Sequence, residues 1–369
     1  MNILYANRFE CMTKKGGDTY QMLCTKEYIN KYFPDINIKI VSSPDEIKKY
    51  QDYDLIHIFN IQFFEETKAY VQEAKKYDMK IVVSPIYWKK SDAIYLARIY
   101  RFTSNFNAIK ICKVFKPVLN FKFSKFRYLS KEYRKQYREL LNNSTAIVPN
   151  STEELEIVNN EFSYRNDIVS SVVPNAIVID NNLEDNNVTC KIDVEDYLLE
   201  VARIEPIKNQ MGVVLSCMDT SFPIVFVGAD NNPRSKYSIK LHELAKRRGN
   251  VYFVGEVPQK EMKYYYTKAK AHILPSFRES PGLVTLEALY NECNVIVSDD
   301  RYCPIHYYKL DQYGIVCDPY SLKSIRKAIS IGMTRTVKKI PKEYFDFISY
   351  DNVANKMNEI YKEVLKTNA

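Results

Sequence analysis

The chain has 369 residues and is 46% hydrophobic, which is enough for two domains of moderate size, each with its own core. Only nine glycines and 15 prolines argue against a disordered chain, and no apolar run of about 18 residues predicts a transmembrane helix. The net charge of +8 allows partners that carry phosphate, an anionic membrane or nucleic acid.

The eight cysteines and four histidines are scattered, and no C-x-x-C pair occurs. We therefore predict neither a disulfide framework nor a zinc site, and expect reduced thiols. The first residues lack the architecture of a signal peptide, so we expect a cytoplasmic protein.

Short buried-strand patterns alternate with helical patterns along the first half of the chain. The predicted strands cover residues 2–6, 36–41, 54–59, 80–85, 145–149 and 172–174, and the predicted helices cover 19–32, 63–77 and 152–159. This alternation predicts a mostly parallel, doubly wound α/β sheet.

Five residues at three places in this half are candidates for ligand contacts. Gly16 and Gly17 stand between a strand and a helix, where backbone N–H groups can approach a phosphate, although a plain turn is the alternative. His57 lies in an apolar strand and is either a satisfied core residue or an acceptor-binding residue at the strand end. Tyr87 and Trp88 form either an apolar wall for a sugar ring or lipid, or core packing.

Residues 89–138 are strongly basic and interleaved with aromatic residues, with only Asp92 and Glu132 as acidic residues. This pattern suits an amphipathic element on an anionic bilayer, and we expect contact with the membrane surface through Lys89 to Arg138. A solvated basic helix pair is the alternative. No nucleic-acid-binding motif is present, so we expect no nucleic-acid partner.

A second alternating block begins near residue 197, after a polar segment at 181–187. Its predicted strands cover 198–202, 222–228, 250–255, 272–274 and 294–298, and its predicted helices cover 211–218, 261–266, 282–290 and 344–365. Arg203 and Lys208 lie five residues apart after the first of these strands, where α/β sheets bind ligands. They can bind phosphate, and plain surface charge is the alternative.

Two carboxylates, Glu279 and Glu287, stand eight residues apart around a turn. Ser280 and Pro281 are the expected N-cap and first residue of the helix between them. The free N–H groups of Gly282, Leu283 and Val284 can then hold an anion. A diphosphate between two hydroxyl-binding carboxylates is the pattern that a nucleotide-sugar requires.

Residues 275–289, P-S-F-R-E-S-P-G-L-V-T-L-E-A-L, resemble the Glu-x7-Glu signature of retaining glycosyltransferases of the GT-B fold, family 4. The stretch from Arg203 to Lys208 is similar to the family's G-R-x-x-x-x-K-G element, with Ala202 and Asn209 replacing the glycines. Many family members carry a histidine after the fourth strand that contacts the donor sugar, whereas this chain has none there.

The resemblance implies two Rossmann-like domains facing a central cleft. Residues 1–175 would bind the acceptor, residues 176–343 would bind the nucleotide-sugar, and the last helix, 344–369, would cross back. The implied catalytic residues are Glu279, Arg203 and Lys208. Donor-binding residues would be these three with Gly16, Gly17, Gly282, Leu283, Val284 and Glu287; acceptor-binding residues would be His57, Tyr87 and Trp88.

The resemblance also implies the activity. We expect a metal-independent, retaining transferase, without a cofactor, that moves sugar from a UDP- or GDP-sugar to a lipid-linked or cell-surface glycan in bacterial polysaccharide, lipopolysaccharide or glycoconjugate assembly. It would act at the inner face of the cell membrane. The alternatives are a nucleotide-sugar epimerase, a phosphorylase or a non-catalytic nucleotide-binding module. An inverting enzyme would need a base, for which Asp18 and His57 are the candidates. No G-x-G-x-x-G follows a strand, which disfavours a dehydrogenase.

Overall fold

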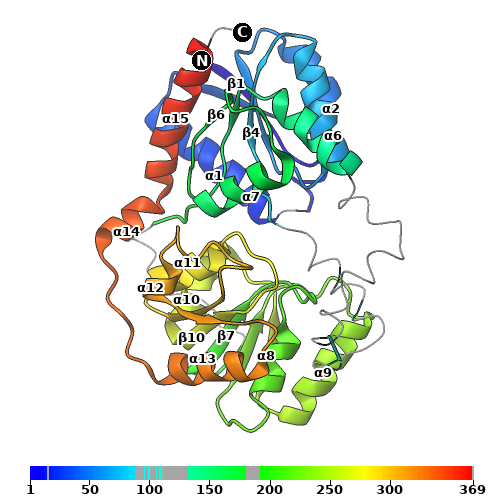
Figure 1. Ribbon diagram of the computed structural model, residues 1–369. Coiled ribbons are helices and arrows are strands. Elements are labelled where there is room, and N and C mark those ends of the chain that lie inside the picture. Colours follow the sequence, from blue (N-terminus) through cyan, green and yellow to red (C-terminus); the bar gives the residue numbers. More distant parts are fainter. Residues whose placement is uncertain are drawn as a thin grey trace. The chain divides into compact units, whose positions relative to one another are not determined.

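The computed structural model describes residues 1–14, 16–88, 131–179 and 192–367, with six single residues at 95, 99, 105, 108, 109 and 111. They form two compact units (Figure 1). The first contains the described residues of 1–88, 131–179 and 342–367. The second contains those of 192–341 together with the six described residues between 95 and 111.

The first unit is built on a parallel sheet of six strands in the order β2-β1-β3-β4-β5-β6. The strands are β1 (Asn2–Ala6), β2 (Asn37–Val41), β3 (Leu55–Phe59), β4 (Lys80–Ser84), β5 (Ala146–Ile147) and β6 (Val169–Ser170). Every residue of β3 is buried, as expected for a strand that helices cover on both faces.

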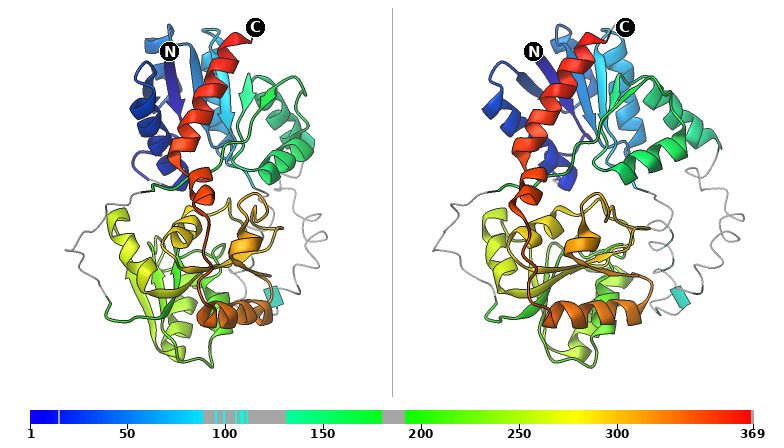
Figure 2. Two further views of the ribbon diagram at one scale, coloured as in Figure 1. Left: turned by 90° about the vertical axis from the view of Figure 1, so that its left-hand side faces the viewer. Right: turned by 60° about the vertical axis from the view of Figure 1, so that its left-hand side comes forward.

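Helices cover both faces of this sheet. On one face α1 (Gly17–Tyr32) runs beside α15 (Tyr350–Lys366), as Figures 1 and 2 show. On the other lie α2 (Phe64–Lys75), α6 (Lys131–Asn142), α7 (Thr152–Phe162) and the 3-10 helix η1 (Pro44–Tyr50). The doubly wound arrangement predicted from the alternation is confirmed.

Two predicted elements of this unit differ in the structure. The single helix expected over 344–365 is two helices, α14 (Lys342–Phe347) and α15, because Ser349 begins a new helix by accepting a hydrogen bond from the N–H of Asn352 (3.1 Å). The strand expected at 172–174 is β6, a few residues earlier. Pro174 has no N–H to donate to a neighbouring strand.

The second unit has a parallel sheet in the order β12-β11-β10-β7-β8-β9. Its strands are β7 (Tyr197–Val201), β8 (Ile224–Val227), β9 (Val251–Gly255), β10 (Ala269–Leu274), β11 (Asn294–Ser298) and β12 (Ile315–Cys317). From β7 the chain adds β8 and then β9 on one side of the sheet. From β10, which lies on the other side of β7, it adds β11 and then β12. The order therefore reverses between β7 and β10, as in a Rossmann fold.

One core of this unit lies beneath α8 (Gln210–Ser216), α9 (Lys236–Arg248) and α13 (Leu322–Thr334). The helices α10 (Met262–Lys268) and α11 (Leu283–Tyr290) contact β10, and α12 (Leu310–Tyr313) and the 3-10 helix η3 (Gln259–Glu261) are short. Tyr95 and Ile109 pack in the core beneath α8, α9 and α13 of this second unit. Both residues fall in the range 1–175, which was predicted for the other domain. The structure differs from the predicted range there, and the roles assigned to the two domains stay predictions.

Candidate functional site

The reversal of strand order between β7 and β10 marks the place where a parallel sheet binds ligands, just beyond the carboxyl ends of its strands. Arg203 lies two residues after β7, and Glu279 lies five residues after β10. The two loops are joined by a backbone hydrogen bond from the N–H of Phe277 to the carbonyl of Ile207 (2.9 Å). The topology thus places the predicted phosphate-binding and sugar-binding loops side by side.

Lys208 and Glu279, both predicted as catalytic, form an ion pair. The Nζ of Lys208 lies 2.6 Å from Oε2 of Glu279, and the two side chains are 19% and 14% exposed. Because both charges are largely removed from water, their attraction is stronger than that of a surface pair. Each group can also offer its charge to a ligand that replaces its partner.

Arg203 lies on a cavity of about 570 Å³ that also contains Glu287, Gln259 and Val284. Its guanidinium Nε is 3.2 Å from Oε1 of Glu205, and its side chain is 60% exposed. The predicted phosphate-binding arginine and one of the two predicted hydroxyl-binding carboxylates therefore share one cavity, which has the size of a small-molecule site.

Glu287 is held by two hydrogen bonds. The hydroxyl of Tyr266 donates to Oε2 (2.8 Å), and Nε2 of Gln259 donates to Oε1 (2.8 Å). Burial raises the pKa of Glu287, and the two donors act in the opposite direction. The carboxylate is thus oriented before any ligand binds.

The start of α11 corrects one prediction. Its N-cap is Gly282 rather than Ser280, with φ of +87°, and Leu283 is the first helical residue. A Cβ at Gly282 would lie 2.8 Å from Cδ2 of Leu274 and 3.0 Å from Cγ of Glu279, so glycine allows both the backbone conformation and the close approach of Glu279. The N–H groups of Leu283 and Val284 belong to the first turn, whose donors lack intrahelical partners.

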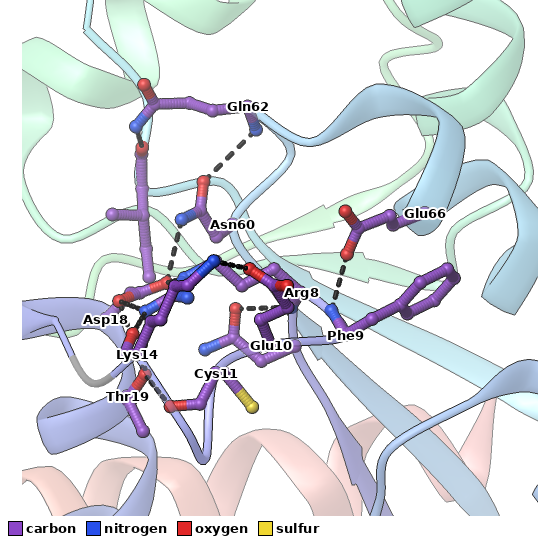
Figure 3. Close-up of polar contacts among 12 residues, drawn as sticks. Arg8, Phe9, Glu10, Cys11, Lys14, Asp18, Thr19, Asn60, Gln62 and Glu66 are labelled. Atoms are coloured by element: carbon purple, nitrogen blue, oxygen red, sulfur yellow. Dashed lines mark hydrogen bonds and ion pairs between the residues drawn. The ribbon is translucent and has the colours of Figure 1, made fainter.

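The first unit has its own reversal of strand order, between β1 and β3. Figure 3 shows the network there: Nε of Arg8 donates to Oδ2 of Asp18 (3.0 Å), and Nδ2 of Asn60 donates to the same oxygen (2.9 Å). Gly16 is the N-cap of α1, and a Cβ on it would lie 2.8 Å from Oδ1 of Asp18. A Cβ on Gly17 would meet no neighbouring group of the described residues within 4 Å. The carboxylate of Asp18, a candidate base, is therefore already hydrogen-bonded to the guanidinium of Arg8 and the amide of Asn60.

His57, Tyr87 and Trp88 are buried. Nδ1 of His57 lies 2.7 Å from the hydroxyl of Tyr361 and Nε2 lies 2.9 Å from that of Ser84, and burial lowers the pKa of His57 to about 3. Tyr87 and Trp88 are 1% and 3% exposed. These surroundings match the core-packing alternative, and the acceptor-binding roles stay predictions.

Sequence reasoning missed Glu200, which lies in β7 directly before the site. It is 1% exposed, and neither carboxylate oxygen has a hydrogen-bond partner among the described residues. Burial raises its pKa well above the usual range, while the charge of Lys208 lowers it and that of Glu279 raises it. A charged residue inside the apolar run Y-L-L-E-V was the available signal.

Most of residues 89–138 lie outside the described residues, so the predicted membrane contact stays a prediction. The described end, 131–138, belongs to α6, which buries Tyr137, Leu140 and Leu141 against the first sheet. Within the part of the chain that the structure describes, no helix is both long enough and apolar enough to cross a membrane.

Residues 184–338 match the family described as Glycosyl transferases group 1. The O-antigen chain mannosyltransferase RfbU of Salmonella typhimurium (strain LT2) is 26% identical over 178 residues, which are 47% of each chain. The aligned region therefore spans about half the length of that relative.

Two solved structures resemble the whole chain. Sucrose-phosphate synthase from Thermosynechococcus elongatus superposes with a TM-score of 0.73 at 14% identity, over 99% of both chains. Anabaena HepE, in complex with UDP and glucose, superposes with a TM-score of 0.70 at 12% identity, over 98% of this chain and 100% of that one. The GT-B fold expected from the sequence is confirmed, and assignment to family 4 stays a prediction.

Proposed function

We propose that this chain, a GT-B fold protein whose residues 184–338 form a group 1 glycosyltransferase domain, transfers a sugar from a UDP- or GDP-sugar to a glycan acceptor. The acceptor would be a lipid-linked or cell-surface glycan of a bacterial polysaccharide or lipopolysaccharide. The similarity to an O-antigen chain mannosyltransferase supports this choice of acceptor.

The observation that carries the proposal is the cavity at the β7/β10 reversal. Arg203 and Glu287 lie on its wall. The Lys208–Glu279 pair lies on the adjoining loops. A nucleotide fits this arrangement if its ribose hydroxyls meet Glu287 and its diphosphate meets the arginine, the lysine and the first turn of α11.

The chemistry follows from where charge develops. As the bond between the anomeric carbon and the phosphate oxygen breaks, negative charge grows on the leaving diphosphate. Fixed positive groups that already face this charge lower the barrier most, and Arg203, Lys208 and the N–H groups of α11 are those groups. Glu279, released by Lys208, would accept hydrogen bonds from the donated sugar.

The acceptor hydroxyl forms the new bond to the anomeric carbon, and its proton passes to the departing phosphate oxygen. No protein base is needed in this scheme. This fits the observation that Asp18 and His57, the two candidate bases, already have hydrogen-bond partners within the protein. We expect retention of configuration and no requirement for a divalent cation or another cofactor.

The test has two stages. Calorimetry with UDP and GDP should show that one of them binds, and incubation with the corresponding sugar nucleotides and a lipid-linked glycan should release nucleoside diphosphate in the presence of EDTA. NMR of the product should show the anomeric configuration of the donor. If a nucleotide binds but no glycan product forms, the chain is not this transferase.

We also propose that the protein acts at the inner, cytoplasmic face of the membrane. The basic stretch Lys89 to Arg138 supports this, because each basic residue near an anionic surface contributes about 1 kcal/mol. The protein should sediment with anionic liposomes at low salt and not with neutral ones. Equal sedimentation with both would contradict the proposal.

A further inference from the structure

The two donors on Glu287 differ in a way that bears on nucleotide binding. Tyr266 is 1% exposed and lies in α10, whereas Gln259 is exposed and lies in the short helix η3 on the wall of the cavity. Each donates one hydrogen bond of 2.8 Å, to opposite oxygens of the carboxylate. One partner is therefore fixed by packing, and the other is free to move.

The fixed partner restricts the carboxylate. The side chain of Glu287 has three rotatable bonds. The hydrogen bond from the buried hydroxyl of Tyr266 removes most of this conformational freedom. Moving Tyr266 away would leave a buried hydroxyl without an acceptor, which is unfavourable because the lost hydrogen bond is not replaced by water. Oε2 therefore stays with Tyr266 whether or not a ligand is bound.

The exchangeable partner covers the other oxygen. Gln259 lies on the same cavity as Glu287 and Val284, and its amide occupies the approach to Oε1. An exposed glutamine that gives up this bond is solvated by water, so its displacement costs little free energy. A hydroxyl that enters the cavity can take its place.

We infer that Tyr266 positions Glu287 for the ribose and that Gln259 occupies Oε1 as a stand-in for a ribose hydroxyl until a nucleotide displaces it. This inference rests on the proposed function. It assigns two residues outside the Glu-x7-Glu stretch to nucleotide affinity, one that increases it and one that competes with it.

The experiment measures Kd by calorimetry for UDP, GDP and their 2′,3′-dideoxy analogues with the wild type, Tyr266→Phe and Gln259→Ala. For the nucleotide that the wild type prefers, Tyr266→Phe should weaken binding about tenfold, as expected for one lost hydrogen bond to a charged group. Gln259→Ala should tighten binding about threefold, as expected for removal of a weak competitor. Neither substitution should change the Kd of the dideoxy analogue, which lacks the hydroxyls.

The comparison of the ribonucleotide with its dideoxy analogue separates this role from a purely structural one, because a damaged fold would weaken the binding of both equally. Gln259 is exposed, so its variant tests the inference even where Tyr266→Phe unfolds. If the wild type prefers the ribonucleotide and both variants bind it as the wild type does, the inference fails and the proposed function stands. If the wild type binds neither UDP nor GDP, both fail.

Discussion

Lys208 and Glu279 lie 71 residues apart in the chain, and their side chains meet at 2.6 Å between Nζ and Oε2. The pair is largely buried, with a second carboxylate, that of Glu200, in strand β7 behind it. In the proposed reaction both partners have other tasks, since Lys208 faces the diphosphate and Glu279 faces the sugar. The pair therefore holds each side chain close to its working position while the donor is absent.

A double-mutant cycle on this pair is the first prediction. Lys208→Ala and Glu279→Ala should each lower kcat by about a hundredfold, because each removes a charge that acts on the transition state. The double variant should lose little more than the worse single variant, since the two residues act as one unit. Steady-state rates at saturating donor measure both effects.

The control for this cycle is the exposed ion pair of Lys240 and Glu243 on α9, elsewhere in the same unit. Removing either partner there should leave kcat unchanged, because exposed pairs contribute little and this one lies away from the cavity. Strictly additive losses at Lys208 and Glu279 would mean that the two residues act independently, contrary to the arrangement proposed.

A second prediction concerns Arg203. Arg203→Ala should raise the Kd for the preferred nucleoside diphosphate by about tenfold to a hundredfold, as expected for lost charge-assisted hydrogen bonds. The loss should be smaller for the nucleoside without phosphates, and smaller at high salt. Arg247→Ala removes an exposed arginine from the same unit and serves as the matched control. An equal loss for nucleoside and diphosphate would contradict the phosphate-binding role.

The two sheets were largely predictable from the sequence because buried parallel strands are short apolar runs. The strands at 2–6 and 294–298 have the predicted bounds, and most others differ by one or two residues at an end. The first residues of the helices were harder to predict. Ser280 carries the expected capping residue type, yet the helix begins after Gly282, because a glycine backbone conformation and the packing of Leu274 decide the turn.

The candidate site was predicted unevenly for a related reason. Arg203, Lys208, Glu279 and Glu287 carry a local pattern, and the structure brings them to one end of one sheet. The residues that hydrogen-bond to them have no such local pattern. Tyr266 contacts Glu287 across 21 residues of the chain, and the sequence around a single tyrosine does not indicate such a contact. Sequence patterns report spacing along one element, whereas these contacts depend on how α10 and α11 pack.

A third prediction uses the buried His272 of β10. Its ring is 0% exposed, neither nitrogen has a partner among the described residues, and burial lowers its pKa from 6.5 to about 3. Between these values the unfolded chain binds a proton that the folded chain does not, so stability falls as the pH drops from about 6.5 towards 3. His272→Leu should remove about 2 kcal/mol of the stability difference between pH 7 and pH 5.

Urea unfolding at both pH values measures this change. His57, with a pKa also lowered to about 3, remains in the variant, so part of the acid sensitivity should persist. The control is His242→Gln, whose side chain is 48% exposed in the wild type. If His272→Leu kept the full pH dependence of the wild type, the folded protein would have to protonate His272 readily.

The last prediction concerns Arg248, at the end of α9. Its guanidinium donates to the carbonyls of Cys217 (2.9 Å), Asn250 (3.1 Å) and Phe222 (2.6 Å), and so ties three segments around one edge of the second sheet. Lysine has no planar fork and cannot reach all three. Arg248→Ala should therefore destabilise the protein by about 2–4 kcal/mol, and Arg248→Lys should recover only part of this. Arg247→Ala, one residue earlier and exposed, should change the urea midpoint very little; an equal cost at both positions would mean that the loss reflects the helix end rather than the guanidinium contacts.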